Sequence, residues 1–202
     1  NDGAGQIREI EEKLMALEEK YPDCVKMPGE GESAVAGNAG SGQEKFPDFQ
    51  GKDLDGKEVN SSELFSGNTV TVVNFWFTTC KPCVGELADL DALNQELAQK
   101  GGAVVGINAF TLDGDEGAIA EAKEILSKKG AAYQNLWFDS DSDAGRFTAG
   151  LYAFPTTYVV DQNGNIVGEP IVGAVTSPEQ TKALNALIEQ ALATCKRNPR
   201  PV

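Results

Sequence analysis

Cys80 and Cys83 are the residues of this chain whose types and spacing most directly indicate chemistry. They enclose Lys81 and Pro82 and follow a run of β-branched and aromatic residues that predicts a strand. A cysteine where a strand gives way to a helix faces unpaired backbone N–H groups and the positive end of the helix dipole, and both favour its thiolate. The thiolate is the attacking form of cysteine, and a second cysteine one turn later can close a disulfide with the first. The pair therefore predicts thiol–disulfide exchange, with Lys81 adding positive charge.

A CxxC pair can also be half of a zinc site or a purely structural disulfide. Zinc requires four ligands, but the chain has no histidine and its other cysteines, Cys24 and Cys195, are far away in sequence. We therefore expect no metal. A structural disulfide is the weaker alternative, because a strand-to-helix CxxC within an α/β pattern is the context in which redox-active pairs occur.

Glu86 lies on the same expected helical face as the second cysteine. Steps of three and four residues connect five positions on that face: Cys83, Glu86, Leu90, Leu93 and Leu97. A carboxylate on an inward apolar face is partly desolvated, which raises its pKa. Because Glu86 is one turn from Cys83, where a proton must leave or arrive during exchange, we expect it to assist proton transfer. The alternative is a carboxylate at the helix start whose head reaches solvent.

The composition sets limits on other functions. The chain has 202 residues, of which 41% are hydrophobic, and a formal net charge of −14. This length suits one domain with appendages. The acidic charge argues against a nucleic-acid partner and against an anionic membrane surface. The absence of histidine excludes Ser-His-Asp and Cys-His catalysis.

Strand and helix patterns alternate after residue 46. We expect strands at 69–77, 103–110, 135–139, 156–160 and 166–167, and helices at 61–65, 80–99, 115–129, 144–152 and 178–195. An Asp-Gly turn within 53–57 predicts a hairpin ahead of them, and Ser61 or Ser62 is the expected cap of the first helix. Ser177 and Gln180 fit a capping box at the start of the last helix. The alternation predicts an α/β fold in which a mixed sheet carries helices on both faces.

The N-terminal part has a different character. Apolar residues at helical spacing predict an amphipathic helix at 6–21, within a segment 1–27 that packs on the core. Residues 28–45 contain five Gly, three Ala, two Ser and no aromatic residue, which is typical of a flexible linker. The expected domain then covers 46–195, and 196–202 form a tail.

Residues 46–194 resemble the thioredoxin superfamily, and within it the extracytoplasmic TlpA/ResA-like thiol–disulfide oxidoreductases. The resemblance rests on five motifs in order: Phe46-Pro47-Asp48-Phe49, Asp55-Gly56-Lys57, Val73-Asn74-Phe75-Trp76, Cys80-Lys81-Pro82-Cys83 and Phe154-Pro155-Thr156-Thr157. The chain departs from the family at two places, with Thr79 where Trp is usual and Phe77 where a small residue is common. These departures concern the surface that meets the substrate.

The resemblance implies a thioredoxin-like fold and no dissociable cofactor. It implies that Pro155 is a cis-proline beside the cysteine pair, which exposes the backbone of Phe154 to a substrate peptide; an ordinary proline at a strand start is the alternative. It also agrees with a functional Glu86, since a glutamate three residues after CxxC is a feature of the ResA-like branch. The substrate surface that it implies comprises Trp76, Lys81, Pro82, Phe154 and Pro155.

In the expected reaction Cys80 attacks a substrate disulfide and Cys83 resolves the mixed disulfide. The implied partners are a disulfide-containing protein substrate and a membrane thiol-reducing electron donor, and we expect a monomer. One alternative is a peroxiredoxin-like peroxidase, but that chemistry calls for Thr three residues and Pro seven residues before the reactive cysteine, where this chain has Phe77 and Val73. The other is a non-catalytic binding module that uses the cis-proline groove.

Cys24 and Cys195 are expected to form a second, structural disulfide. Each continues the apolar stripe of its helix, the first at 6–21 and the second at 178–195, so the two helices would pack together. Such a bridge indicates an oxidising compartment, whereas two free buried thiols would suit the cytosol. We therefore expect an extracytoplasmic location, with tethering through a removed N-terminal leader or lipid anchor.

Overall fold

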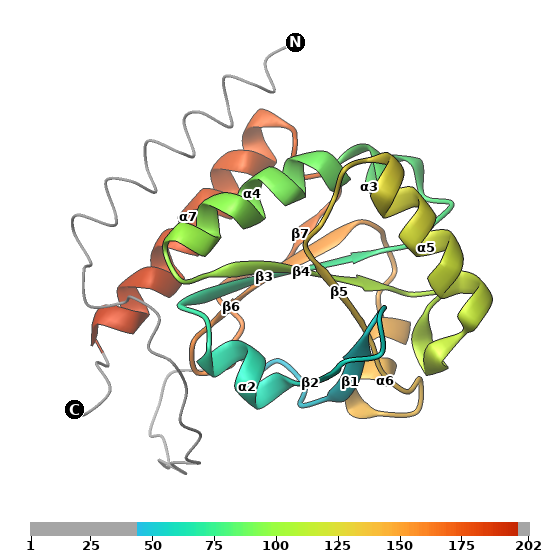
Figure 1. Cartoon of the computed structure of the whole chain (residues 1–202). Coiled ribbons are helices and arrows are strands. Elements are labelled where there is room, and N and C mark those ends of the chain that lie inside the picture. The colour runs from blue at the N-terminus through green and yellow to red at the C-terminus, as the bar shows by residue number, and fades with distance from the viewer. Residues whose placement is uncertain (1–43, 198–202) are drawn as a thin grey trace.

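The computed structural model describes residues 44–197, which form one mixed sheet covered by helices on both faces (Figure 1). The strands are β1 (Gln50–Asp53), β2 (Glu58–Asn60), β3 (Val70–Trp76), β4 (Ala103–Asn108), β5 (Gln134–Trp137), β6 (Thr156–Asp161) and β7 (Ile171–Val172). Their order across the sheet is β2-β1-β5-β4-β3-β6-β7. Strands β3, β4 and β5 are parallel, and the other neighbours pair antiparallel. The expected α/β architecture is confirmed.

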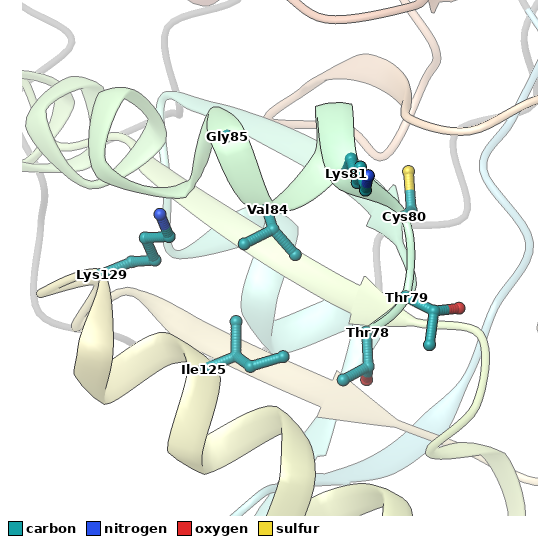
Figure 2. A pocket seen from close by; sticks show the side chains of 8 residues that line it. All are labelled: Thr78, Thr79, Cys80, Lys81, Val84, Gly85, Ile125 and Lys129. Atoms are coloured by element: carbon teal, nitrogen blue, oxygen red, sulfur yellow. The ribbon is translucent and has the colours of Figure 1, made fainter.

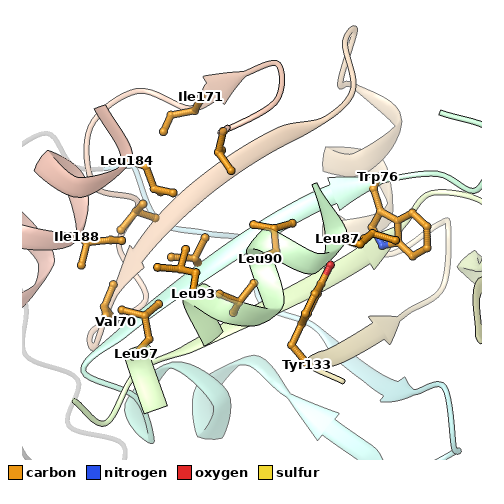
Figure 3. Packing of buried hydrophobic residues seen from close by; sticks show 14 of the residues in the cluster. Val70, Trp76, Leu87, Leu90, Leu93, Leu97, Tyr133, Ile171, Leu184 and Ile188 are labelled. Carbon is orange, nitrogen blue, oxygen red and sulfur yellow. The ribbon is translucent and has the colours of Figure 1, made fainter. Parts of the chain in front are cut away.

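Helices occupy both faces of this sheet. They are α2 (Ser61–Ser66), α3 (Lys81–Gly85), α4 (Leu87–Gln99), α5 (Glu116–Lys128), α6 (Asp143–Ala149) and α7 (Pro178–Arg197), with a 3₁₀ turn at Leu112–Gly114. Buried residues of α4, α5 and α7 join one core cluster, and those of α2 and α6 join the other. Figure 3 shows the first cluster, in which leucines of α4 lie over β3 and meet Leu184 and Ile188 of α7.

The central strand β3 holds the two cores together. Every residue of β3 is buried, as its unbroken β-branched and aromatic pattern predicts for a strand covered on both sides. Because side chains alternate along a strand, Val72 and Trp76 join the cluster under α4, whereas Val73 and Phe75 join the cluster under α2 and α6. The carboxyl end of β3 thus delivers the chain directly to the cysteine pair.

The expected helix at 80–99 is in fact two helices. Helix α3 ends at Gly85 and α4 begins at Leu87, with Glu86 between them at φ −101° and ψ −2°. Glycine at this point weakens helical continuity. The apolar stripe nevertheless continues across the break, because Cys83, Glu86 and Leu90 are all fully buried.

Two smaller expectations were wrong, and a third is confirmed only in part. The cap of α2 is Asn60, whose side chain accepts from the Glu63 N–H, while the Ser61 hydroxyl accepts from the Phe49 N–H. Residues 166–167 make only a bridge to β6, and the strand that pairs there is β7. The capping box is half formed, because Ser177 accepts from the Gln180 N–H but the Gln180 side chain donates to a carbonyl of β7.

The N-terminal expectations lie outside the described residues. These are the helix at 6–21 within the segment 1–27, and nearly all of the linker at 28–45. The described elements from β1 to α7 fall within the expected domain, apart from the last two residues of α7. Among residues 44–197 no helix has both the length and the apolar character that a membrane crossing requires.

Candidate active site

The cysteine pair lies at the carboxyl end of β3 and forms a disulfide in this structure. Cys80 and Cys83 are bonded, with their Cα atoms 5.2 Å apart. Cys80 precedes α3 as its N-cap, and its sulfur accepts a hydrogen bond from the Cys83 N–H at 3.3 Å. Because this N–H is already aimed at the Cys80 sulfur, it can stabilise a thiolate there when the disulfide opens. Because α3 has only five residues, this local N–H, and not the dipole of a long helix, is the main stabilising contact for such a thiolate.

The two cysteines differ in accessibility. Cys80 keeps 6% of its surface exposed, whereas Cys83 is completely buried. Lys81 and Pro82 between them are both exposed, and so is Thr79 just before them. An external thiol or disulfide can therefore approach Cys80 and not Cys83.

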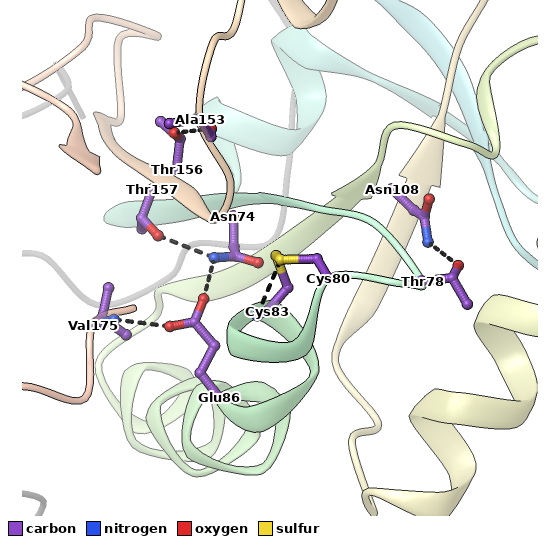
Figure 4. The surroundings of a disulfide bond; sticks show 10 residues. All are labelled: Asn74, Thr78, Cys80, Cys83, Glu86, Asn108, Ala153, Thr156, Thr157 and Val175. Carbon is purple, nitrogen blue, oxygen red and sulfur yellow. Dashed lines mark hydrogen bonds between the residues drawn. A yellow bond between two sulfur atoms is a disulfide. The ribbon is translucent and has the colours of Figure 1, made fainter. Parts of the chain in front are cut away.

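Glu86 is buried beside this pair (Figure 4). The side-chain amide of Asn74 donates to Oε1 of Glu86 at 3.0 Å, and the Val175 N–H donates to Oε2 at 2.8 Å. Burial raises the pKa of the Glu86 carboxyl from 4.5 to about 7; the hydrogen bonds from Val175 and Asn74 oppose this rise, and the nearby Asp89 charge adds to it. The alternative of a solvent-reaching head is wrong, since Glu86 has no exposed surface.

Asn74 connects Glu86 to the sheet. It is the single amide in the middle of β3, and the register places it opposite Thr157 of β6. Its Nδ2 donates to the Thr157 hydroxyl at 3.0 Å as well as to Glu86. Because a carboxylate and a hydroxyl share that one nitrogen, the carboxylate is held in a fixed orientation between the sheet and the loop before α7. Sequence reasoning did not select Asn74 for this role, although an amide inside an apolar strand was a visible signal.

The Phe154–Pro155 peptide bond is cis, as the resemblance implies. Pro155 is buried, and its carbonyl accepts from the Gly173 N–H at 2.8 Å. The backbone N–H and carbonyl of Phe154 have no partner among residues 44–197. A strand-like segment of another chain can therefore pair with Phe154.

Three aromatic rings pack together near the carboxyl end of β3, and sequence analysis named two of them. Phe77 packs against Phe110 with ring centroids 5.1 Å apart and against Phe154 at 5.2 Å. Phe110 is 49% exposed and lies just after β4, so it was overlooked as an ordinary strand end. Phe77 thus places a ring where the peroxidase alternative expects a threonine hydroxyl.

Trp76 is a correction to the expected substrate surface. Its side chain is fully buried, and its Nε1 donates to Asn135 at 2.8 Å. Strand β4 lies between the two residues, and Gly106 of that strand leaves room for the Asn135 side chain to cross. Trp76 therefore supports the sheet, and its side chain is not exposed at the surface.

Cys195 lies near the end of α7 and is engaged in a disulfide. Its expected partner, Cys24, lies outside the described residues, so the pairing stays a prediction.

Comparisons with known proteins agree with this geometry. Residues 43–168 match the AhpC/TSA family. The thiol-disulfide oxidoreductase ResA of Bacillus anthracis is 34% identical over 139 residues, which make up 67% of this chain and 69% of that protein. The thioredoxin-like protein YneN of Bacillus subtilis is 33% identical over 144 residues, 70% of this chain and 78% of that protein.

Solved structures show the same arrangement. A Chlorobium tepidum structure named for the thiol:disulfide interchange protein DsbE superposes with a TM-score of 0.59 at 28% identity, and it covers 74% of this chain and 96% of its own. The relatives are thiol-disulfide oxidoreductases by name, and the CxxC disulfide and the mixed sheet of this chain fit that activity. The chain therefore belongs to the AhpC/TSA family, has a thioredoxin-like fold, and is a thiol–disulfide oxidoreductase.

Proposed function

We propose that the protein reduces disulfides of exported polypeptides, with Cys80 as the nucleophile, Cys83 as the resolving thiol and Glu86 as the proton-transfer group. The observation that carries this proposal is the difference between the two sulfurs. Cys80 is accessible, and its sulfur accepts a hydrogen bond from a backbone N–H. Cys83 is fully buried, one helical turn from the buried carboxyl of Glu86.

The reaction has two exchange steps. The Cys80 thiolate attacks one sulfur of the substrate disulfide, which forms a mixed disulfide and releases one substrate thiolate. Cys83 then gives its proton to Glu86 and attacks the Cys80 sulfur, which restores the Cys80–Cys83 disulfide and releases the second substrate thiolate. Two electrons pass to the substrate, and each released thiolate takes up one proton. A carboxyl with a pKa of about 7 suits this role because it can accept and return a proton near neutral pH.

The substrate contacts proposed here surround Cys80. The backbone of Phe154, unpaired among the described residues, supports strand-like pairing with a polypeptide, beside the buried cis-proline Pro155. Lys81 and Pro82 are exposed beside the nucleophile. Phe77, three residues before Cys80, packs against the half-exposed Phe110, and this apolar pair suits an unfolded polypeptide more than a small polar molecule.

The location and the electron donor are proposals as well. We infer an extracytoplasmic protein that is tethered to the membrane and re-reduced by a membrane thiol donor, because the ResA-like resemblance implies both. The expected Cys24–Cys195 bridge supports an oxidising compartment. In this arrangement the domain 46–195 works as a monomer.

Alkylation of the fully reduced protein tests the assignment of roles. A limiting amount of iodoacetamide should label Cys80 well before Cys83, because only Cys80 is accessible and its thiolate is hydrogen-bonded. Cys83→Ser should trap a Cys80 mixed disulfide with reduced and re-oxidised insulin, and Cys80→Ser should trap none. Faster labelling of Cys83, or trapping by Cys80→Ser alone, would contradict the proposal.

A further inference from the structure

A surface hollow adjoins Cys80 (Figure 2). It lies between α3 and α5 and has a volume of about 370 Å³. Val84 of α3 and Ile125 of α5 point into it from the two helices, and Cys80 stands at its rim. A group bound in this hollow would therefore lie next to the residue that carries the reacting sulfur.

The charge of the hollow is opposite to that of the chain. Its lining includes two lysines, Lys81 and Lys129, and no carboxylate. Both lysines are exposed, and neither forms an ion pair with any residue between 44 and 197. By contrast Lys128, one residue away, is bonded to Glu124 at 2.7 Å. In a chain of net charge −14, an ammonium group next to the nucleophile and a second one across the hollow form a local site for negative charge.

We propose that this hollow is a subsite for a carboxylate-bearing group next to the substrate's disulfide. The carboxylate would approach Lys129 and Lys81, and the carbon atoms between it and the sulfur would cover Val84 and Ile125. The subsite rests on the proposed function, because it defines which disulfides Cys80 attacks most rapidly. Two sources present this chemistry: an acidic residue beside a cysteine of a polypeptide, and a small organic disulfide that carries carboxylates.

The size of the effect follows from the exposure of the lysines. One exposed ammonium several ångströms from a carboxylate changes a rate constant by about three-fold at low ionic strength. Lys129→Gln should therefore lower the preference for anionic over neutral disulfides by about three-fold, and Lys129→Glu by about ten-fold. Lys128→Gln and Lys128→Glu change the net charge equally but lie outside the hollow, so they serve as matched controls.

The experiment uses the full chain, reduced and freed of reductant, in single turnovers quenched with acid and followed by mass spectrometry. Dithiodipropionate is the anionic disulfide, hydroxyethyl disulfide the neutral one and cystamine the cationic one. In each turnover the protein dithiol becomes the Cys80–Cys83 disulfide and the small disulfide becomes two thiols. The measured quantity is the ratio of the anionic to the neutral rate constant, which cancels any general loss of reactivity in a variant.

The expected result is a ratio that falls in both Lys129 variants, stays constant in both Lys128 variants and declines with added salt. An equal ratio in all five proteins, or an equal fall in the Lys128 variants, would overturn the subsite while the proposed function stands. Failure of the native protein to reduce both hydroxyethyl disulfide and the peptide disulfides would overturn the proposed function and the subsite with it. Peptide disulfides with Asp or Asn beside the cysteine then distinguish the two sources. If the native protein prefers the Asp peptide and the Lys129 variants do not, the subsite serves polypeptides. If the native protein shows no such preference, the subsite serves small anionic disulfides.

Discussion

Glu86→Gln should change how the stability of the oxidised protein depends on pH. The carboxyl is buried, and burial raises its pKa from 4.5 to about 7. A group that holds its proton more tightly when folded gives its full stability below the unfolded pKa and loses it as pH rises through the folded pKa. At about 1.4 kcal/mol for each pKa unit, the rise corresponds to about 3 kcal/mol between about pH 4 and pH 8.

The substitution isolates this effect. Glutamine keeps the size and the neutral state of the protonated acid, but its amide nitrogen cannot accept from Asn74 or Val175 as an oxygen does. That lost hydrogen bond costs roughly the same free energy at every pH, so it displaces the curve without changing its slope. The free energy of unfolding of the native protein minus that of Glu86→Gln should therefore fall by about 3 kcal/mol from about pH 4 to pH 8.

Urea unfolding followed by tryptophan fluorescence at several pH values measures this difference. Glu121→Gln, on the exposed side of α5, is the control for removing one carboxylate from an acidic chain. A difference between native protein and Glu86→Gln that stays constant across the range would refute the inference that burial raises the pKa of Glu86. The same pair of proteins should give different rate–pH profiles for disulfide exchange, and superimposed profiles would remove Glu86 from the proton-transfer step.

Three other perturbations test neighbouring features. Asn74→Ala removes a hydrogen bond that lowers the pKa of Glu86, so the rate–pH profile should move to higher pH. Trp76→Phe leaves the Asn135 acceptor unpaired and should lower the free energy of unfolding by about 1–3 kcal/mol, measured in urea. The expected Cys24–Cys195 bridge should resist mild reductant that opens Cys80–Cys83, and peptide mapping after stepwise reduction should show the 80–83 thiols first; four thiols appearing together would contradict this.

The sequence predicts the framework of the site because the framework depends on short-range patterns. An unbroken apolar run identifies β3 as a central strand, and helical spacing from Cys83 through Leu90 puts Glu86 on the buried face. The same alternation could have prevented the error at Trp76. It shares a side of β3 with Val72 and therefore points into the core under α4.

Other features depend on contacts that no local pattern contains. The Val175 N–H reaches Glu86 from 89 residues away, and Phe110 reaches Phe77 from the end of a different strand. The pairing of β7 is also non-local. Residues 166–167 have strand-like composition, but the chain turns at Gly168, with φ 65°, before a ladder can form.

The break between α3 and α4 shows why Glu86 is more than a helix-start acid. A carboxylate at the N-cap of α4 would ordinarily accept from that helix's free N–H groups, yet Glu86 makes no side-chain cap bond there. Its two oxygens go instead to Asn74 and Val175, inside the core and away from solvent. Capping would have kept the carboxylate exposed, with no reason for its pKa to rise. Glu86 therefore does not cap α4. Its buried carboxyl, with a pKa of about 7, lies instead one turn from Cys83, where a resolving thiol must lose its proton.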